Sequence, residues 1–391
     1  MKIAFIGQKG VPTKSGGVER HVEELAARLA KKGHEVFLYA RNNYTEKSLA
    51  EYRGIKIIRL PSISTKNLDA ITHTFFATLH ALFQNYDVIH YHSIGPASLS
   101  FLIKLFKRKT ALIATYHCQD YNHKKWGTFA KLYLKFGELA ASVFPDRTIA
   151  VSKILGEHIF KKYKRKATII PNGMDVSPVK ESDYLAKWNL QKGGYVVYIG
   201  RLIRHKGVHY LIQAFKNLED KHLARGKKLV IVGEGFYTDD YVKELKDSSR
   251  GRENIIFTGN LSGEALSQLF SHSYLFVQPS ESEGLSLALL EAMGYGKAVL
   301  SSDIPENMEP LNDQAAIFFR TGDAADLEEK LVGLINDPVL VKQMGEAGMA
   351  KAREEYSWDT VVDKIEASYL DILAQKRNYK FKTPQINAKN I

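Results

Sequence analysis

The sequence predicts an α/β protein made of two domains, each built on a parallel sheet covered by helices. The first observation is length, because 391 residues is about twice the size of a common domain. The second is a repeated alternation of short β-rich runs with amphipathic helical stretches. The third is that this alternation pauses at a turn-rich segment, residues 171–178, and then begins again. We therefore expect one domain over residues 1–178 and a second over residues 179–357.

Strands and helices alternate through the first predicted domain. Residues 18–32 repeat apolar side chains at helical spacing, among them Val22 and Leu25, and the pattern ends at Gly33. Similar helical patterns cover residues 67–83 and 96–106. Because strands that alternate with helices pair in parallel, this arrangement predicts one sheet with helices on both faces. The predicted strands cover residues 2–6, 35–40, 55–60, 87–91, 111–116 and 147–151.

The same alternation returns in the second predicted domain. Its strands are expected at residues 196–199, 229–232, 255–257, 275–278 and 298–301. A last amphipathic helix is predicted over residues 358–373, where apolar side chains such as Val361, Ile365 and Tyr369 recur at helical spacing. The tail over residues 376–391 is polar and basic, and we expect it to be loose.

The net charge of +12 comes entirely from the first domain. Residues 1–178 hold 28 Lys and Arg against 13 Asp and Glu, a balance of +15, and the remainder of the chain has a balance of −3. Much of the excess lies in three clusters, at residues 104–109, at Lys124, Lys125, Lys131 and Lys135, and at residues 161–166. Such clusters favour an anionic partner, which is a membrane surface, a phosphorylated substrate or a nucleic acid. Solvated helix ends are the alternative explanation for each cluster.

Composition also bears on where the protein works. Cys118 is the only cysteine, so no internal disulfide can form, which is typical of a reducing cytosol. The apolar run at the N-terminus is too short for the core of a signal peptide. We find no stretch of about 18 apolar residues that could span a bilayer. We therefore expect a cytoplasmic protein that can also rest on the inner face of the cell membrane.

The first domain offers two candidate positions where predicted strands end. A long glycine-bearing loop with Gly16 and Gly17 follows the first strand and precedes a helix, where free N–H groups favour a phosphate. The loop matches neither a dinucleotide fingerprint nor a phosphate-binding P-loop. His117 directly follows the strand at residues 111–116 and is placed to donate a hydrogen bond. A plain flexible loop and a structural histidine are the alternatives.

The second domain offers cations and carboxylates at equivalent positions. Arg201 and Lys206 lie between the strand at residues 196–199 and the next helix, where two fixed cations suit a diphosphate. Glu283 and Glu291 follow the strand at residues 275–278, and their eight-residue spacing places them within about 80° of each other on a helix. Glu281 does not give this spacing. Solvated cations and a buried capping network are the alternatives.

Taken in order along the chain, these motifs resemble the retaining glycosyltransferases of family 4, which have the GT-B fold. The resemblance covers nearly the whole chain and is closest to the branch that builds bacterial surface polysaccharides. It implies two Rossmann-like domains that face each other across a cleft, with residues 358–375 packing back on the first. The first domain would bind the acceptor and the second the donor. The positions that carry the resemblance are Gly16, Gly17, His117, Arg201, Lys206, Glu283 and Glu291.

The resemblance also implies a role for each of these residues. Arg201 and Lys206 would neutralise the departing diphosphate, and Gly17 would bring its backbone N–H to the distal phosphate. Gly16 would belong to the same donor-binding loop. Glu291 would accept hydrogen bonds from the ribose. His117 would contact the sugar or stabilise charge near the anomeric carbon. The sugar hydroxyls would be held by Glu283 and by the backbone N–H groups of Gly284, Leu285 and Ser286.

The implied reaction is a hexosyl transfer from a UDP-, GDP- or dTDP-sugar to a lipid-linked or polysaccharide acceptor, in cell-envelope or exopolysaccharide synthesis. No cofactor or metal would be required, and the sequence contains no Asp-x-Asp triplet and no His/Cys cluster with ligand spacing. Three alternatives stay open: a sugar-nucleotide 2-epimerase, a nucleic-acid-binding protein and a non-catalytic membrane-associated subunit. The basic clusters lack interleaved aromatic residues, which disfavours nucleic acid as the partner.

Overall fold

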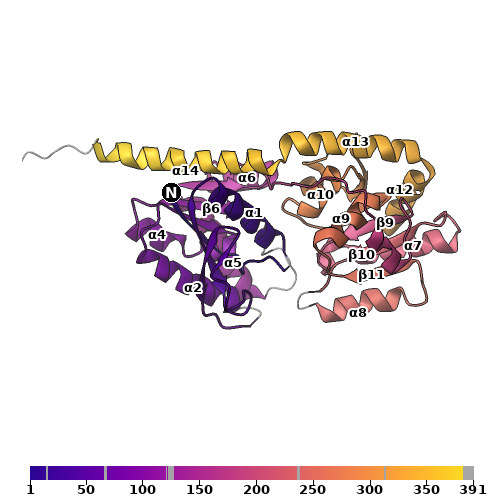
Figure 1. Cartoon of the computed structure of the whole chain (residues 1–391), viewed down its shortest axis with the longest axis horizontal. Helices are drawn as coiled ribbons and strands as arrows, with labels where there is room; N and C mark the ends of the chain where they lie inside the picture. Colours follow the sequence, from indigo (N-terminus) through magenta and orange to yellow (C-terminus); the bar gives the residue numbers. More distant parts are fainter. Residues whose placement is uncertain are drawn as a thin grey trace, which may run out of the picture. The chain divides into compact units, whose positions relative to one another are not determined.

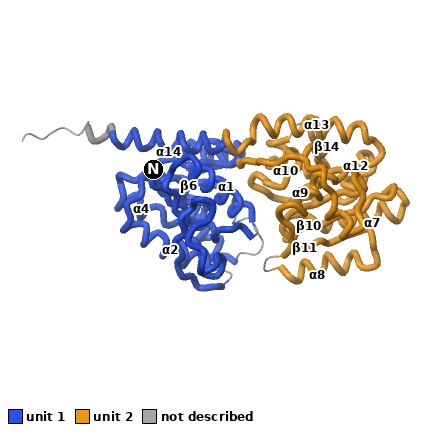
Figure 2. Tube along the Cα trace, in the orientation of Figure 1, with its two compact units in different colours: residues 1–171, 361–391 blue, residues 172–360 orange. Residues whose placement is uncertain are grey.

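The computed structural model describes residues 1–14, 16–65, 68–119, 121, 127–235, 238–311 and 314–381, with side chains as far as residue 377. The chain forms two compact units (Figure 2). Unit 1 consists of Met1–Pro171 together with Val361–Ile391, and unit 2 consists of Asn172–Thr360. The chain therefore leaves unit 1, completes unit 2, and returns to unit 1 through its last helix.

The units divide at residue 171, seven residues before the predicted boundary at 178. The turn-rich segment belongs to unit 2 because its polar groups bond there. The amide of Asn172 donates a hydrogen bond to the Leu285 carbonyl over 2.8 Å. Met174 forms an isolated parallel bridge with Ser357. Gly173 lies so close to Trp358 that a Cβ atom would approach the indole ring to 2.4 Å.

Unit 1 contains an eight-stranded sheet in the order β3-β4-β2-β1-β5-β6-β7-β8. Every pairing is parallel except the short β3–β4 pair at one edge. All residues of the central strands β5 and β6 are buried, as expected where helices cover both faces. The strands are β1 (Lys2–Ile6), β2 (Glu35–Arg41), β3 (Glu51–Tyr52), β4 (Ile55–Leu60), β5 (Val88–His92), β6 (Ala111–Tyr116), β7 (Arg147–Ala150) and β8 (Thr168–Ile169).

The helices of unit 1 connect these strands. The predicted single helix at residues 96–106 is instead two short helices, α3 and α4, separated near Leu99. The helices are α1 (Gly17–Lys31), α2 (Leu68–Leu82), α3 (Ile94–Ala97), α4 (Ser100–Phe106), α5 (Thr128–Val143) and α6 (Lys153–Tyr163).

Unit 2 contains a six-stranded parallel sheet in the order β11-β10-β9-β12-β13-β14. Part of its core is a cluster in which strand residues such as Val196 and Leu229 pack against helix residues such as Leu211 and Leu331. The strands are β9 (Tyr195–Ile199), β10 (Lys228–Val232), β11 (Ile255–Gly259), β12 (Leu275–Gln278), β13 (Ala298–Ser302) and β14 (Ala316–Phe319). The helices are η2 (Asp183–Trp188), η3 (Arg204–Lys206), α7 (Val208–Asp220), α8 (Asp239–Ser248), α9 (Gly263–His272), α10 (Leu287–Gly294), α11 (Pro305–Met308), α12 (Ala324–Asn336) and α13 (Pro338–Glu355).

The last helix, α14 (Trp358–Phe381), extends beyond the predicted end at residue 373 and packs on unit 1 (Figure 1). The buried hydroxyl of Tyr369 lies 2.6 Å from Nδ1 of His90. The ammonium group of Lys376 donates to the carbonyls of Arg108 and Thr110 over 2.9 Å each. Helix α14 thus continues into the first residues of the tail that was expected to be loose, and Lys376 is bonded to unit 1. Residues 382–391 lie outside the described residues.

Candidate active site

The strand order of unit 2 identifies where a ligand binds. Strand β9 pairs with β10 on one side and with β12 on the other, so the chain changes direction across the sheet between β9 and β12. In open α/β sheets ligands bind beyond the carboxyl ends of the strands at such a switch point. Two loops meet this description, the one at residues 200–207 after β9 and the one at residues 279–286 after β12. They contain Arg201, Lys206 and Glu283.

The two loops of unit 2 approach each other through their backbones. Gly207 has a φ of +70°, and a Cβ atom on it would lie 1.8 Å from the Pro279 carbonyl oxygen. The N–H of Glu281 donates to the His205 carbonyl over 2.7 Å. The Glu281 carboxylate accepts a 2.7 Å hydrogen bond from the Tyr210 hydroxyl on α7. Only glycine permits this approach at residue 207, so the loops form one fixed unit.

Glu283 and Lys206 form a partly buried ion pair between these loops. The Glu283 side chain is 7% exposed and the Lys206 side chain is 15% exposed. Oε1 of Glu283 accepts from the Lys206 ammonium and, over 2.6 Å each, from the Gln278 amide and the Ser280 hydroxyl. Gln278 and Ser280 escaped prediction, since uncharged residues at the end of a strand give no distinctive signal. The pair places a cation and a carboxylate at the switch point.

Glu283 and Glu291 do not lie on one helix, contrary to the prediction from their spacing. Helix α10 begins at Leu287, so Glu283 lies in the preceding loop and an angle of 100° per residue does not apply to it. The helix begins there because the hydroxyl of Ser286 caps it, accepting from the Leu289 N–H. Glu291 lies in the second turn of α10 and is half-buried.

The backbone just before α10 is buried and fixed. Gly284, Leu285 and Ser286 are all buried. The carbonyl of Leu285 accepts the Asn172 hydrogen bond, and the Ser286 hydroxyl lies 3.5 Å from the amide oxygen of Gln278. Because this segment leads into a helix N-terminus, its N–H groups can serve electronegative atoms of a ligand.

Arg201 is exposed at the end of β9. Its carbonyl oxygen accepts a 3.1 Å hydrogen bond from the Tyr198 hydroxyl, which orders the backbone directly after the strand. The neighbouring Gly200 lies against Gly233, where a Cβ atom would come within 1.9 Å of the Gly200 carbonyl oxygen. Gly233 has a φ of +139°, which residues with a side chain rarely adopt. Gly233 could not be identified in advance, because a glycine's φ cannot be read from the sequence.

Unit 1 has an equivalent switch point, between β1 and β5. Gly16 precedes α1 with a φ of +108°, and Gly17 is the first residue of that helix. A Cβ atom on Gly16 would collide with the carboxylate of Glu19, at 2.1 Å. The structure therefore places both predicted glycines at a helix N-terminus, where backbone N–H groups are available to an anion.

His117 follows β6 and is buried in a group of histidines. Its Nε2 atom lies 3.1 Å from Nδ1 of His92, which ends β5. Burial, with smaller contributions from His21 and His90, lowers the pKa of His117 well below its usual value, so the ring is neutral at physiological pH. This cluster could not be recognised from the sequence, since His21, His92 and His117 are distant along the chain.

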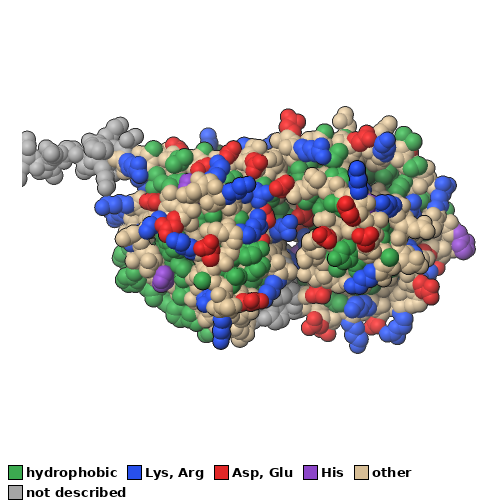
Figure 3. All heavy atoms as spheres, viewed as in Figure 1, with side chains coloured by type: hydrophobic (Ala, Val, Ile, Leu, Met, Phe, Trp, Pro, Cys, Tyr) green, Lys and Arg blue, Asp and Glu red, His purple; other side chains and the backbone are tan. Residues whose placement is uncertain are grey.

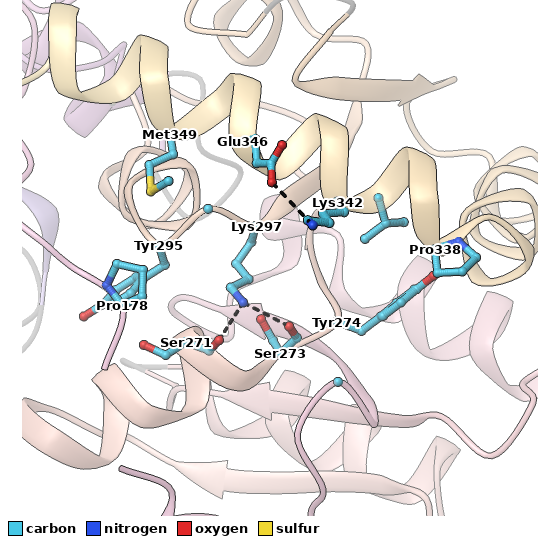
Figure 4. Close-up of a pocket in the computed structure, with 13 residues that line it drawn as sticks. Pro178, Ser271, Ser273, Tyr274, Tyr295, Lys297, Pro338, Lys342, Glu346 and Met349 are labelled. Atoms are coloured by element: carbon cyan, nitrogen blue, oxygen red, sulfur yellow. Dashed lines mark hydrogen bonds and ion pairs between the residues drawn. The ribbon is translucent and has the colours of Figure 1, made fainter. Parts of the chain in front are cut away.

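A pocket of unit 2 lies at the opposite, amino ends of the strands (Figure 4). It is lined by Tyr274, Lys297 and Lys342, and Tyr274 and Lys297 directly precede β12 and β13. The Lys297 ammonium donates to the carbonyls of Ser271 and Ser273. Burial lowers the pKa of Lys297 to about 8. These residues are separate from the switch point, and we assign them no part in it.

The two parallel-sheet units have the GT-B fold. Sucrose-phosphate synthase from Thermosynechococcus elongatus shares the fold with a TM-score of 0.81 and 20% identity, over 96% of this chain and 99% of that one. Anabaena HepE, solved with UDP and glucose, gives a TM-score of 0.79 and 20% identity, over 95% of this chain and all of that one.

Sequence comparison specifies the family. Residues 181–351 match the family described as glycosyl transferases group 1, and residues 15–178 match glycosyltransferase family 4. The O-antigen chain mannosyltransferase C of Escherichia coli is 26% identical over 392 residues, which cover 96% of this chain and all of that protein. The chain belongs to glycosyltransferase family 4. Within the part of the chain that the structure describes, no helix is both long and apolar enough to cross a membrane.

Proposed function

We propose that the protein is a retaining hexosyltransferase that moves a sugar from a nucleotide-diphosphate sugar to a lipid-linked or polysaccharide acceptor, without a required metal ion. The observation that carries this proposal is the Lys206–Glu283 ion pair at the switch point of unit 2. The relatives support the substrates, because HepE was solved with UDP and glucose and the Escherichia coli protein is named for an O-antigen chain. Synthesis of the cell envelope or of an exopolysaccharide is the corresponding process.

The ion pair suggests how donor binding is organised. A diphosphate carries more negative charge than one carboxylate and competes for the Lys206 ammonium. When Lys206 turns to the phosphates, Glu283 keeps its bonds from Gln278 and Ser280 and gains capacity to accept from a sugar hydroxyl. Arg201, exposed at the end of β9, supplies the second cation. Glu291 accepts from the ribose, and the N–H groups of residues 284–286 hold the sugar.

The chemistry follows from the charge that develops during the reaction. Cleavage of the anomeric C–O bond gives an oxocarbenium-like transition state, and negative charge accumulates on the departing diphosphate. Arg201 and Lys206, held at the ends of fixed loops, stabilise that charge without reorganising. The leaving phosphate accepts the proton of the acceptor hydroxyl as that hydroxyl attacks from the same face, which retains the anomeric configuration. We also propose that the backbone N–H groups at Gly16 and Gly17 contact a phosphate and that His117 contacts the sugar.

The test is a transfer assay on purified protein with a panel of UDP-, GDP- and dTDP-sugars. One donor is expected to support transfer, and incubation with donor alone should leave the sugar unchanged, which excludes an epimerase. Arg201→Ala is expected to lower turnover, and Glu291→Ala to raise the donor KM. The matched control is Arg204→Ala, since Arg204 lies near Arg201 but pairs outward with Glu244. Full activity in both site variants would contradict the assignment.

We also propose that unit 1 rests on an anionic membrane through α5. Exposed apolar side chains recur along this helix at Phe129, Leu132, Phe136 and Leu139, with Phe129 82% exposed. Lys131 and Lys135 lie on the same helix. Figure 3 shows further exposed hydrophobic side chains over α2 and α4. Phe83, which directly follows α2, and Phe106, which ends α4, are both exposed. An apolar stripe beside cations is the pattern that binds the interface of an anionic bilayer.

Vesicle co-sedimentation tests this membrane contact. Phe129→Ser with Leu132→Ser should reduce binding to phosphatidylserine-containing vesicles, and Lys131→Glu with Lys135→Glu should remove the preference for them over phosphatidylcholine. Leu223→Ser, an exposed leucine of unit 2, is the control. Unchanged sedimentation of the α5 variants would refute the contact. Of the basic clusters, Lys124 and Lys125 lie outside the described residues.

A further inference from the structure

Three buried histidines converge at the switch point of unit 1. His21 comes from α1, His92 ends β5 and His117 follows β6. Their exposed fractions are 1%, 0% and 6%. One ring nitrogen from each histidine lies within 4.8 Å of the others. Residues separated by 71 and 25 positions are thus brought together only by the strand order of the sheet.

The spacing of these nitrogens is close to that of a metal's ligands. Two nitrogens bound to tetrahedral zinc at about 2.0–2.1 Å lie about 3.3 Å from each other. Nδ1 of His92 and Nε2 of His117 are already 3.1 Å apart. The His21 ring meets the His117 ring edge-on, with 4.9 Å between centroids. A movement of at most about 1.5 Å at the third nitrogen would complete the ligand spacing.

A neutral imidazole carries a lone pair, and this is the form that binds a metal ion. Nε2 of His92 is buried, and among the described residues it has no hydrogen-bond partner.

His90 provides a comparison within the same strand. It lies two residues before His92 and their ring centroids are 4.2 Å apart. Both nitrogens of His90 are bonded, Nδ1 to the Tyr369 hydroxyl and Nε2 to the Thr115 hydroxyl. His90 is thus fully bonded, as buried polar groups normally are. His92 differs from His90, because Nδ1 of His92 lies against His117 while its Nε2 has no hydrogen-bond partner among the described residues.

We propose that His21, His92 and His117 form a binding site for one divalent transition-metal ion, with zinc the best match. Imidazole nitrogen suits zinc, copper and nickel, whereas magnesium and calcium prefer oxygen. Three imidazoles leave one position of a tetrahedral ion open to water or another ligand.

The ion would inhibit transfer, an effect that rests on the proposed function of His117. A nitrogen of His117 that binds zinc is no longer available to a sugar hydroxyl. The proposed reaction uses protein cations and no metal, so the bound ion would not assist transfer in any other way. Micromolar zinc should therefore lower activity, and a chelator should restore it.

Direct metal binding tests the site without reference to activity. Tag-free, chelator-treated protein is titrated with Co²⁺, whose visible absorption is strong in tetrahedral sites, and Zn²⁺ is then added as a competitor. One equivalent should bind, and Zn²⁺ should displace it. His92→Gln and His21→Gln should each weaken binding more than tenfold. His73→Gln is the matched control, because His73 is a buried histidine of unit 1 that is not part of the cluster.

X-ray absorption on the wild-type zinc complex avoids any dependence on variants that fold poorly. A first shell of nitrogen at about 2.0–2.1 Å with scattering from three imidazoles is expected. A shell dominated by oxygen, or Co²⁺ binding as tight in His92→Gln as in the wild type, would overturn the site. Zinc binding without inhibition would leave the site in place and refute only the role of His117 in transfer.

Discussion

Glu138 in α5 allows a stability prediction with a magnitude. Its side chain is fully buried, and its carboxylate accepts hydrogen bonds from Lys162, Tyr116, Tyr163 and His158. Burial alone would raise the pKa of Glu138, but these bonds outweigh it and lower the pKa from 4.5 to about 2. A shift of this size corresponds to about 3 kcal/mol of folding free energy, at about 1.4 kcal/mol per pKa unit.

The sign of the pH dependence follows from the lowered pKa of Glu138. The folded state holds the ionised form, so its contribution is complete above pH 4.5 and is lost as the pH falls towards 2. Glu138→Gln mimics the protonated group. It should lower the free energy of unfolding by about 3 kcal/mol at pH 7 and by only about 1.4 kcal/mol at pH 3.

Urea unfolding of wild type and Glu138→Gln at both pH values measures these differences. The signal should come from unit 1, since the two units can unfold separately. Glu157→Gln, on the exposed face of α6, is the control and should change stability by less than about 0.5 kcal/mol. A Glu138→Gln effect that is equal at pH 7 and pH 3 would refute the reasoning, because packing alone would then explain it.

Two further predictions concern unit 2. Gly207→Ala should weaken donor binding and lower the free energy of unfolding by more than about 2 kcal/mol, because its Cβ would meet the Pro279 carbonyl. Gly226→Ala has the same positive φ with nothing nearby, and should cost only about 1 kcal/mol in the same urea titration; equal losses would contradict the clash. The Lys297 pKa of about 8 predicts that its acylation rate, followed by peptide mass spectrometry, reaches half its maximum near pH 8. A rate that still rises steeply above pH 9.5 would contradict that pKa.

The local elements could be predicted from the sequence because periodicity is a local property. The strand at residues 111–116 and the helix from residue 18 follow from apolar spacing, and strand ends located His117 and Lys206. Local patterns also have limits. The apolar pattern did not reveal that α10 begins only after its N-cap, Ser286. The polarity of the tail did not reveal the hydrogen bonds of Lys376 to unit 1.

The assembled sites could not be predicted, because they depend on strand order. Lys206 and Glu283 are 77 residues apart and meet only because β9 and β12 are neighbours. His92 and His117 meet because β5 pairs with β6, and each histidine alone looks structural in the sequence. Charge and residue type thus indicated the candidates, while the sheet topology determined their partners.

The central claim is that Lys206 at the switch point of unit 2 binds the diphosphate of a nucleotide sugar. Isothermal titration of the active donor into wild type, Lys206→Ala and Arg204→Ala tests it most directly. We predict that Lys206→Ala weakens binding at least tenfold, as expected for loss of a charged hydrogen bond, and that Arg204→Ala binds within twofold of wild type. Equal donor affinity in Lys206→Ala and wild type, with both proteins folded, would contradict the account.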